Sequence, residues 1–355
     1  MKINREYCIE LGRSGLRMPI GADLVLHELP DPEAAARDGA RLGRVLEEAA
    51  QRYNTPLAFP LMDLRLEKAD LLQHFGIAET EVDAFHFREA PGEHAAEEIR
   101  TAGNAGFPGR NRAHIHSVRY IAESTELVPV GMAIGPFSLL TKLMADPIPA
   151  LAMAGMGVGA GEDPDVLIAE RCLALAEAAV QRSIAAQMDA GAKLILICEP
   201  AASIVYISPR QMEAGSGLFD RFVIEPHLRI KEQLETAGVG LIFHNCGELT
   251  DGMVRSFAER LRPMILSLGS SRRLWLDADL VADDIVLFGN LPTKKFYSDA
   301  VISDEEVARL TCELAERMRD TGHPFILGSE CDVLHVPDAA ETIRRKVRVM
   351  LTAGK

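Results

Sequence analysis

Short apolar runs recur along the chain, each ending at a glycine, a proline or a polar residue, with longer amphipathic stretches between them. Short apolar runs bounded in this way are typical of buried parallel strands, and the longer stretches have helical periodicity. The eight candidate strands are LAFPLM (57–62), DAFHF (83–87), VPVGMA (128–133), KLILIC (193–198), GLIFHN (240–245), MILSL (264–268), IVLFG (285–289) and FILGS (325–329). Because eight strand–helix units can close on themselves, the pattern predicts an α/β fold, a single (β/α)8 TIM barrel.

The stretches between these runs carry helix signals. The segment 167–191 ends at a glycine suited to a helix C-terminus, and 303–322 opens with a serine N-cap followed by carboxylates. The first 55 residues precede the first candidate strand and include a strongly helical stretch at 34–53, so we expect an N-terminal extension that covers the barrel floor. No repeat or low-complexity linker divides the sequence, so we expect residues 1–355 to form a single domain.

One long segment, 135–165, differs from the others because it is apolar and rich in both glycine and methionine. It follows a strand end. One interpretation is a buried helix followed by a flexible loop. The other is a mobile lid, or a surface that receives a large apolar partner, since methionine-rich surfaces repack easily.

Composition narrows the class of protein. Hydrophobic residues make up 48% and charged residues 25% of the chain, as in a globular protein with an ample core. The formal net charge of −14, with no local cluster of lysine and arginine, argues against binding to nucleic acid or to anionic lipid. The N-terminus lacks the apolar stretch of a signal peptide, and no window approaches 18 uninterrupted apolar residues, so we expect a cytoplasmic protein.

The cysteines do not form a disulfide framework. There are six, at positions 8, 172, 198, 246, 312 and 331, which is too few and too scattered for such a framework. In a reducing compartment each is a metal ligand, a catalytic residue or part of the core. Cys172 and Cys312 lie within amphipathic stretches and Cys8 lies near the terminus, so we interpret these three as structural.

The motif HNCG at 244–247 is the strongest chemical signal in the sequence. It comes directly after a predicted strand, at the carboxyl end where barrel active sites form. Because alternate residues of a strand point the same way, His244 and Cys246 can bind one metal ion together. Taken alone, a His-x-Cys pair is more often a core cysteine beside a hydrogen-bonded histidine.

A third ligand changes that interpretation. Cys331 follows the last predicted strand in an equivalent position, so it can converge with His244 and Cys246 above the barrel. Two thiolates and one imidazole suit zinc, and three protein ligands with a fourth position open are typical of catalytic zinc. We therefore predict a catalytic zinc site.

Three further polar residues are candidate catalytic residues, because each lies at or just beyond a predicted strand end. Glu199 follows the fourth strand and is the carboxylate best placed to share the mouth with zinc; its alternative role is as a helix cap or as support for the ligands. Asp63 follows the first strand and Asn290 the seventh, and we expect both to line the substrate cavity.

Several of these segments together resemble the uroporphyrinogen decarboxylase superfamily, and more closely its zinc-dependent, corrinoid-linked (cobalamin) methyltransferase branch. The matching pieces span about 57–351. They are GMAIGPFSLLTKLM, DAGAKLILICEPAASIVYISPRQM, LIFHNCGEL, LFGNLP and GSECDVLHVPDAAETI. Their order and spacing are more specific than any one of them.

This resemblance implies zinc bound by His244, Cys246 and Cys331, and it implies that Gly135 and Pro136 of the Gly-Pro-Phe segment contact the cofactor. The true decarboxylases carry an N-terminal arginine-rich motif for a substrate with many carboxylates. The corresponding region here, LGRSGLRMPIG, has only Arg13 and Arg17. That departure argues against decarboxylation of a porphyrinogen.

The resemblance also implies a reaction and a partner. A methyl group moves between a corrinoid, carried by a separate protein as methylcobalamin, and a small substrate at zinc, because this chain has no cobalamin-binding motif of its own. The substrate is a thiol such as coenzyme M, or a methyl ether, a methylamine or a folate, and the sequence leaves the direction of transfer open. A decarboxylase-like lyase without zinc and a non-catalytic thiol sensor are the alternatives.

Overall fold

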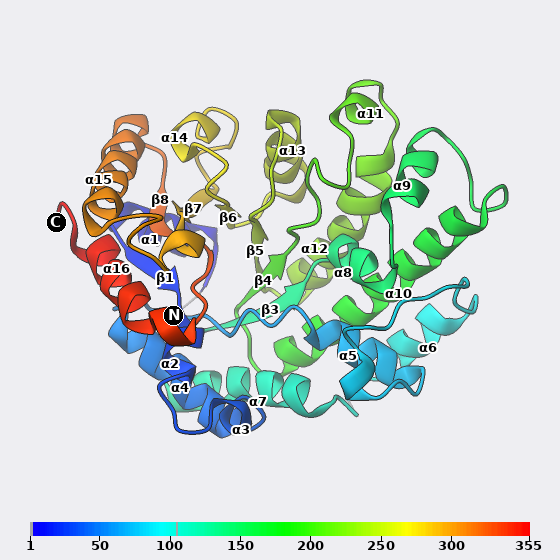
Figure 1. Cartoon of the computed structure of the whole chain (residues 1–355), viewed down its shortest axis with the longest axis horizontal. Coiled ribbons are helices and arrows are strands. Elements are labelled where there is room, and N and C mark those ends of the chain that lie inside the picture. Colours follow the sequence, from blue (N-terminus) through cyan, green and yellow to red (C-terminus); the bar gives the residue numbers. More distant parts are fainter. Residues whose placement is uncertain (1–2, 104–105) are drawn as a thin grey trace.

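In the computed structural model, which describes residues 3–103 and 106–355, eight parallel strands form one curled sheet (Figure 1). The strands are β1 Arg17–Ile20, β2 Leu57–Ala58, β3 Val128–Ile134, β4 Leu194–Cys198, β5 Gly240–Asn245, β6 Ile265–Leu268, β7 Val286–Leu291 and β8 Phe325–Asp332. Their order is β1-β8-β7-β6-β5-β4-β3-β2. The first strand pairs with the last, and the curled sheet has β1 and β2 at its two edges, so the predicted (β/α)8 fold is confirmed.

Helices surround this sheet on its outer side. Those of the described residues are α1 Arg5–Arg13, α2 Ala22–Leu26, α3 Pro32–Ala36, α4 Gly39–Arg52, α5 Leu66–His74, α6 Ala95–Thr101, α7 Gly109–Ser124, α8 Pro136–Leu143, α9 Ile148–Gly155, α10 Pro164–Asp189, α11 Pro209–Glu213, α12 Glu225–Thr236, α13 Asp251–Ser256, α14 Leu274–Asp277, α15 Asp304–Thr321 and α16 Ala340–Thr352. Short 3-10 turns (η1 Glu79–Glu81, η4 Thr293–Lys295, η5 Pro337–Ala339) and π turns (η2 Asp220–Ile224, η3 Phe257–Leu261) accompany them. No helix in this part of the chain combines the length and hydropathy needed to cross a bilayer.

Seven of the eight predicted strands are confirmed, although β2 keeps only two residues of its predicted six. The strand predicted at 83–87 is wrong, because this segment lies outside the sheet. The rings of Phe85 and Phe87 pack edge to face with centroids 5.1 Å apart, and the Phe87 N–H donates to the Leu143 carbonyl at 2.8 Å. The ring of Phe87 also packs edge to face on Phe75 at the end of α5, with centroids 5.2 Å apart, so the segment packs against a helix and does not pair with a strand.

The missing strand is β1, which lies inside the segment expected to precede the barrel. The expectation that residues 1–55 precede every barrel strand is therefore wrong. This strand is short and contains Pro19, which cannot donate a backbone hydrogen bond. Its register with β8 shifts between Met18 and Ile20, and such an irregularity accommodates a proline in a strand.

Helix α1, which precedes β1 in the same N-terminal segment, contacts the end of the barrel that is opposite the candidate metal ligands. Arg5 of α1 donates through Nη1 to the carbonyl oxygens of Pro263 and Asp284, each at 2.9 Å. These carbonyls lie just before β6 and β7, so α1 packs against the amino-terminal ends of the strands.

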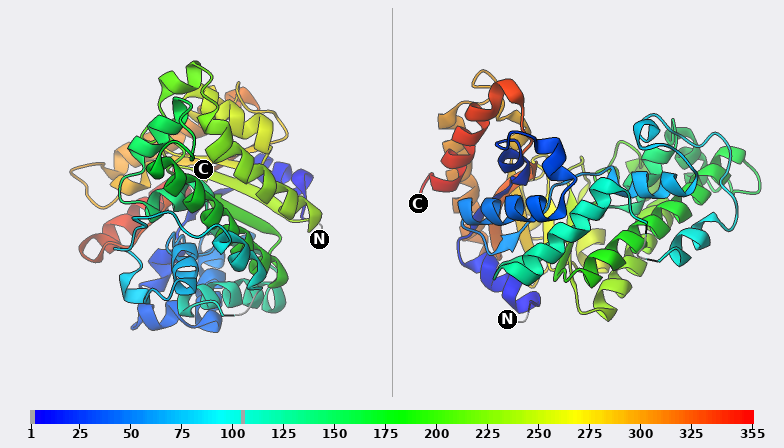
Figure 2. Two further views of the ribbon diagram at one scale, coloured as in Figure 1. Left: turned by 90° about the vertical axis from the view of Figure 1, so that its right-hand side faces the viewer. Right: turned by 90° about the horizontal axis from the view of Figure 1, so that it is seen from below.

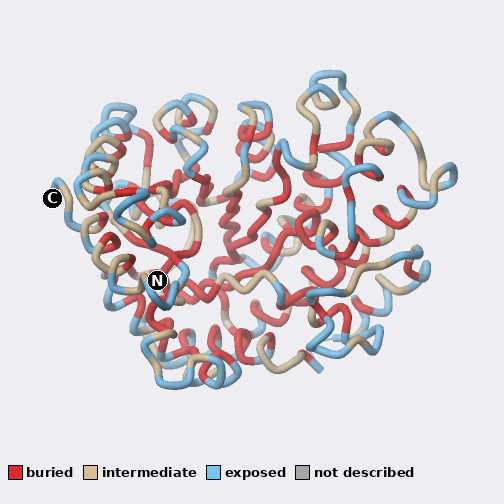
Figure 3. Tube along the Cα trace, in the orientation of Figure 1, coloured by how far each residue is buried: buried red, intermediate tan, exposed pale blue. Residues whose placement is uncertain are grey.

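The core has two layers, one on each face of the sheet. Leu194, Leu196 and Cys198 of β4 belong to a cluster inside the barrel, whereas Ile195 and Ile197 belong to the cluster between the sheet and the helices. Figure 3 colours most of the strands at the centre of the molecule red, the colour of buried residues. Because side chains fill the barrel, any chemistry takes place at its rim.

The long connections between β2 and β4 extend away from the barrel to one side (Figure 2). The segment 135–165 belongs to this part, as α8, α9 and the start of α10. Gln211, beyond β4, donates to the carbonyl of Ala152 in α9 at 2.9 Å. The segment therefore lies on the carboxyl-terminal side of the sheet. A segment that forms part of the mouth or of a partner surface must lie on this side.

Candidate metal centre

The structure brings His244, Cys246 and Cys331 together at the carboxyl ends of β5 and β8. One nitrogen of His244 and the two sulfurs lie within 4.8 Å of one another. Within the described chain this is the single group of three or more such side chains close enough to hold a metal ion. Cys246 and Cys331 are 85 residues apart in the sequence, and the curvature of the sheet brings them together.

The histidine is arranged as a metal ligand. Its Nδ1 lies 2.8 Å from the Ser267 hydroxyl on the neighbouring strand β6, so with Nδ1 protonated the lone pair is on Nε2. Nε2 is buried and has no hydrogen-bond partner among the described residues. A buried nitrogen without a partner costs free energy, and a metal ion at the two sulfurs would remove that cost.

The two thiols are unequal. A hydrogen bond from Cys331 lowers the pKa of the Cys246 thiol, and the cation of Lys294 lowers it further, against the opposing effect of burial. That same hydrogen bond, followed by burial, raises the pKa of Cys331. The pair therefore holds Cys246 as a thiolate, the form that binds metal, and a metal ion would replace the remaining proton.

The residue between the two ligands on β5 explains how the HNCG motif holds its shape. Asn245 points to the other face of the strand, where its amide donates to the carbonyls of Glu199 and Ala202 at 2.6 and 2.9 Å. Its carbonyl oxygen accepts the N–H of Gly247 at 2.8 Å. Asn245 thereby fixes the turn that carries Cys246.

A close backbone approach supports the same turn. A Cβ at Gly269, just after β6, would lie 2.8 Å from both the Cα and the carbonyl oxygen of Cys246. Only glycine fits there without displacing backbone. The end of β6 therefore packs directly against the metal-binding turn.

Two charged residues flank the sulfurs. Burial opposes the charge of Lys294, yet the nearby Cys246, Cys331 and Glu330 outweigh burial and raise its pKa. Glu330 accepts hydrogen bonds from the Ser270 hydroxyl at 2.5 Å and from the Lys294 N–H at 3.2 Å. Glu330 thus ties the loops after β6 and β7 to β8, and Lys294 places a positive charge beside the thiolate.

A cavity opens beside the cysteine of β8. Its volume is about 300 Å³, and its lining residues are Met62, Leu64, Thr293, Lys294, Tyr297, Cys331, Asp332, Leu334, Val336 and Ile343. The Cys331 Sγ lies 3.7 Å from the Sδ of Met62 at the cavity wall. The cavity therefore borders the metal site at Cys331, and most of its wall is apolar.

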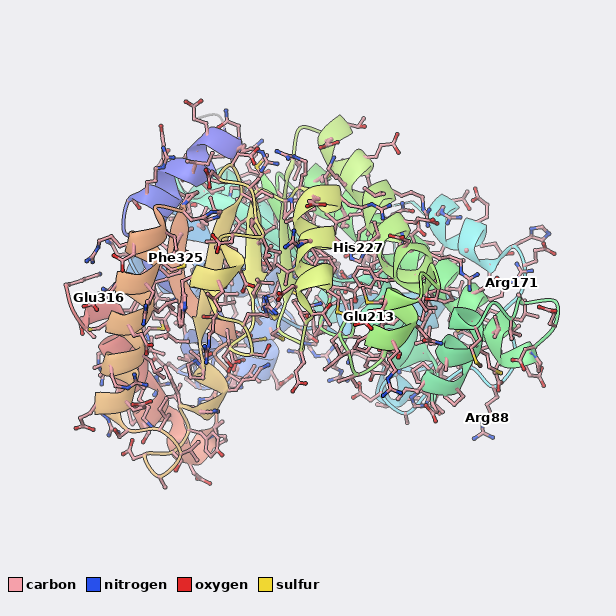
Figure 4. The ribbon with its side chains drawn as sticks, turned by 90° about the horizontal axis from the view of Figure 1, so that it is seen from above. Arg88, Arg171, Glu213, His227, Glu316 and Phe325 are labelled. Carbon is pink, nitrogen blue, oxygen red and sulfur yellow. The ribbon has the colours of Figure 1, made fainter. Side chains whose placement is uncertain are left out.

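The candidate catalytic residue Glu199 directly follows β4, the strand that pairs with β5, but it faces away from the metal ligands. Its carboxylate is fully buried and accepts the N–H groups of Phe137 and Ser138, at 3.1 and 2.6 Å, at the start of α8. Its Oε2 lies 3.2 Å from Nε2 of His227, which Figure 4 labels on α12. Burial raises the pKa of Glu199 to about 7 and lowers that of His227 to about 4. The structure favours the helix-capping role that the sequence left open.

The two residues expected to contact the cofactor lie at the same helix start. Gly135 is the N-cap of α8 and Pro136 is its first residue, and both are buried. A Cβ at Gly135 would lie 2.1 Å from Oε2 of Glu199. Because Glu199 already occupies the N–H groups of this helix start, contact of Gly135 and Pro136 with a cofactor stays a prediction.

The other two candidate catalytic residues are Asn290, which stabilises a loop, and Asp63, which lines a different cavity. Asn290 donates to the carbonyls of Gly269 and Arg272, at 2.8 and 2.9 Å, and so fixes the loop after β6. Asp63 lies 3.3 Å from Nε of Arg110 and lines a second, smaller cavity with it. The structure does not place Asp63 among the residues that line the cavity at Cys331.

Sequence reasoning missed Ser267, Asn245, Lys294 and Glu330. Ser267 is the one polar residue inside the apolar run MILSL, and Glu330 directly precedes Cys331 in FILGSECD. Both positions could have been recognised from the sequence as candidates for the site. Lys294 carried none, because it lies in an irregular turn that only the fold brings to the sulfurs.

Two comparisons with known proteins find matches. The family model described as Uroporphyrinogen decarboxylase (URO-D) matches residues 77–349. A solved structure, a methyltransferase from Methanosarcina mazei, is similar with a TM-score of 0.67 and 14% sequence identity, covering 98% of this chain and 97% of that chain. At that identity the likeness shows the fold. A search of curated proteins finds no match.

Proposed function

Because the chain belongs to the uroporphyrinogen decarboxylase family, we propose that it is an enzyme of that family's zinc-dependent methyltransferase type. In this proposal it moves a methyl group between a corrinoid on a partner protein and a small substrate held at the metal. The observation that carries the proposal is the donor set itself: a buried imidazole nitrogen without a partner beside two sulfurs.

The residues present fit zinc. His244, Cys246 and Cys331 supply one nitrogen and two sulfur ligands, the soft and borderline donors that zinc prefers. When bound, zinc would supply positive charge that favours the deprotonated form of a substrate thiol or polarises the heteroatom of a methylated substrate.

The chain's own residues have supporting roles in this proposal. Ser267 orients the His244 ring so that Nε2 faces the sulfurs, and Asn245 and Gly269 hold Cys246 in position. The charge of Lys294 stabilises the thiolate before metal is loaded. The apolar residues of the cavity lower the polarity beside Cys331, which strengthens electrostatic interactions there.

The exposed surface around the mouth suits a protein partner. Ile204 and Val205 in the loop after β4, Val301 after β7 and Leu334 after β8 are exposed, from 37% at Ile204 to 60% at Val205 and Leu334. All four lie in loops at the carboxyl ends of strands, where the metal ligands also lie. Since this chain has no cobalamin-binding motif, we propose that a corrinoid protein docks here.

The positions of the N-terminal arginines favour this proposal over a decarboxylase-like lyase. Arg17 donates to the carbonyls of Met350 and Ala353 near the end of α16. Arg13 and Arg17 line a cavity with the start of β8, at the opposite end of the strand from Cys331. Neither arginine is placed to bind substrate carboxylates at the mouth.

The test is metal-dependent conversion between methylcob(III)alamin and cob(I)alamin, followed by absorbance, after elemental analysis of the zinc-loaded protein. Thiols, methyl ethers, methylamines and folate are tried with free cobalamin and with a cognate corrinoid protein. We expect one zinc per chain and conversion that Cys246→Ser abolishes. Protein that binds no zinc, or conversion that is unaffected by loss of zinc, would contradict the proposal.

A further inference from the structure

The cavity beside Cys331 has a composition that indicates what it holds. Six of its ten lining residues are apolar or aromatic: Met62, Leu64, Tyr297, Leu334, Val336 and Ile343. They come from the connection after β2, the loops after β7 and β8, and α16. The metal ligand Cys331 forms part of the same wall, so a molecule in this chamber lies next to the metal site.

The size of the chamber is that of a substituted ring. Its volume is about 300 Å³. An apolar cavity of about 150 Å³ holds benzene, so the chamber accommodates one ring together with a reacting group and a further substituent. A two-carbon thiol would leave most of the apolar wall without contacts, which forfeits the free energy of burying it.

Two polar atoms of the lining lack hydrogen-bond partners. Oγ1 of Thr293 and Oδ1 of Asp332 are both buried, and neither has a partner in the part of the chain that the structure describes. The two residues are 5% and 7% exposed. Buried polar atoms are nearly always paired, so two such atoms in one cavity point to a ligand that pairs with them.

The two unpaired atoms are both oxygens: Oδ1 of Asp332 can accept a hydrogen bond, and Oγ1 of Thr293 can donate or accept one. A ligand group that donates therefore suits the pair better than an anionic tail, which can only accept. The polar end of the ligand is better described as an uncharged hydroxyl, which can donate to Asp332 and both donate to and accept from Thr293.

We propose that the chamber is the substrate subsite and that the methyl donor or acceptor is a hydroxylated aromatic compound. The reacting heteroatom lies at the metal beside Cys331, the ring packs between Met62 and Leu334, and the hydroxyl pairs with Thr293 and Asp332. This inference rests on the proposed function, since it names the substrate class of that site.

The test uses calorimetry on the zinc-loaded chain with three thiols that place sulfur on the metal: 4-mercaptophenol, 4-methylbenzenethiol and 2-mercaptoethanol. The two aromatic thiols differ only in hydroxyl against methyl. We expect 4-mercaptophenol to bind about tenfold more tightly than its methyl analogue, because only the hydroxyl pairs with the buried atoms. Equal binding of the two would count against the hydroxyl contact.

Variants assign that preference to named residues. Thr293→Val keeps the shape of the side chain and removes its hydroxyl, so it should reduce the preference for 4-mercaptophenol to about threefold or less, whereas Thr293→Ser should retain it. A preference that persists unchanged in Thr293→Val would overturn the assignment of the contact to this residue.

A matched pair of leucines tests the ring contact. Leu334 lines the cavity and Leu276, in α14, does not, yet both are exposed, at 60% and 53%, so neither alanine variant threatens the fold. Leu334→Ala should weaken the binding of both aromatic thiols about threefold and leave 2-mercaptoethanol unchanged. Leu276→Ala should change none of them. Equal effects of the two variants would overturn the subsite.

The outcomes separate this inference from the proposed function. If no thiol binds in a zinc-dependent way, the metal proposal has failed. If all three thiols bind at zinc and neither the hydroxyl nor Leu334 matters, the metal proposal stands and the aromatic substrate class is wrong.

Discussion

Two buried polar clusters lie at the carboxyl ends of neighbouring strands, and they are built in opposite ways. In the cluster around Glu199, the carboxylate accepts two backbone N–H groups of α8 and lies 3.2 Å from Nε2 of His227. That nitrogen makes no hydrogen bond within the described residues, but it faces this carboxyl group. In the cluster at β5 and β8, His244 is oriented by Ser267 and its second nitrogen has no partner within the described residues. Glu199, His227 and His244 are almost inaccessible to solvent, whereas Cys246 and Cys331 are partly exposed.

This difference distinguishes buried groups that stabilise the fold from buried groups that can bind a metal ion. A buried group whose hydrogen bonds go to the protein's own backbone holds elements together, and its loss costs stability. A buried group left unpaired beside thiols is maintained at a cost, which a bound metal ion offsets. We therefore expect damage to the first cluster to lower the free energy of unfolding, and damage to the second to lower metal affinity.

The largest expected effect is the removal of both sulfurs. The Cys246→Ser, Cys331→Ser double variant should reduce zinc from one per chain to nearly none, because serine hydroxyls are poor zinc ligands at neutral pH. Elemental analysis measures the zinc, and circular dichroism checks that the fold is kept. Stoichiometric zinc in this variant would sink the ligand assignment.

A pair of glycines gives the next largest effect. Gly135→Ala places a Cβ 2.1 Å from Glu199 Oε2 and should lower the unfolding free energy by about 3 kcal/mol with little change in zinc affinity. Gly269→Ala places a Cβ 2.8 Å from the Cys246 backbone and should weaken zinc binding instead. Urea unfolding and zinc competition are measured on both. If the two variants behave alike, the distinction between the clusters is lost.

The buried carboxylate predicts a pH dependence. Burial raises the folded pKa of Glu199 to about 7, above its unfolded value, so its contribution to stability is complete below about pH 4.5 and is lost as the pH rises through 7. Between pH 5 and 8 the wild type should therefore lose about 2 kcal/mol more than Glu199→Gln. The charging of His227 at low pH is common to both proteins, so comparing them isolates Glu199. Parallel stability profiles would contradict this pKa shift.

Replacing one buried serine in each cluster should have the smallest effects. Ser267 orients His244, so Ser267→Ala should weaken zinc binding by roughly tenfold, as is typical for groups that orient a metal-binding histidine. Ser138 accepts the N–H of Ala201 at 2.9 Å, so Ser138→Ala should cost about 1 kcal/mol of stability and leave zinc affinity unchanged. Competition with a chromophoric chelator measures the first effect and urea unfolding the second. Weakened zinc binding in Ser138→Ala would show that the clusters are coupled.

The sequence by itself determined the barrel and the three candidate metal ligands. Apolar runs of strand length recur because parallel strands are buried on both faces, and ligands that follow strand ends share one face of any such barrel. The strand prediction failed where the apolar pattern does not correspond to burial within the sheet. The alternating aromatics of 83–87 pack against other segments, and β1 is too short and proline-containing to give a strand signal.

Only the tertiary structure decided which polar residues at the mouth hold the fold and which face the cavity. Glu199, Asp63 and Asn290 all follow strand ends, yet Glu199 caps α8, Asp63 contacts Arg110 and Asn290 binds the loop after β6. Lys294 and Thr293 carried no signal, and they line the chamber at Cys331 together with Asp332. The physical reason is that a strand end fixes where a residue lies, whereas its partners come from loops whose paths depend on the packing of the whole barrel.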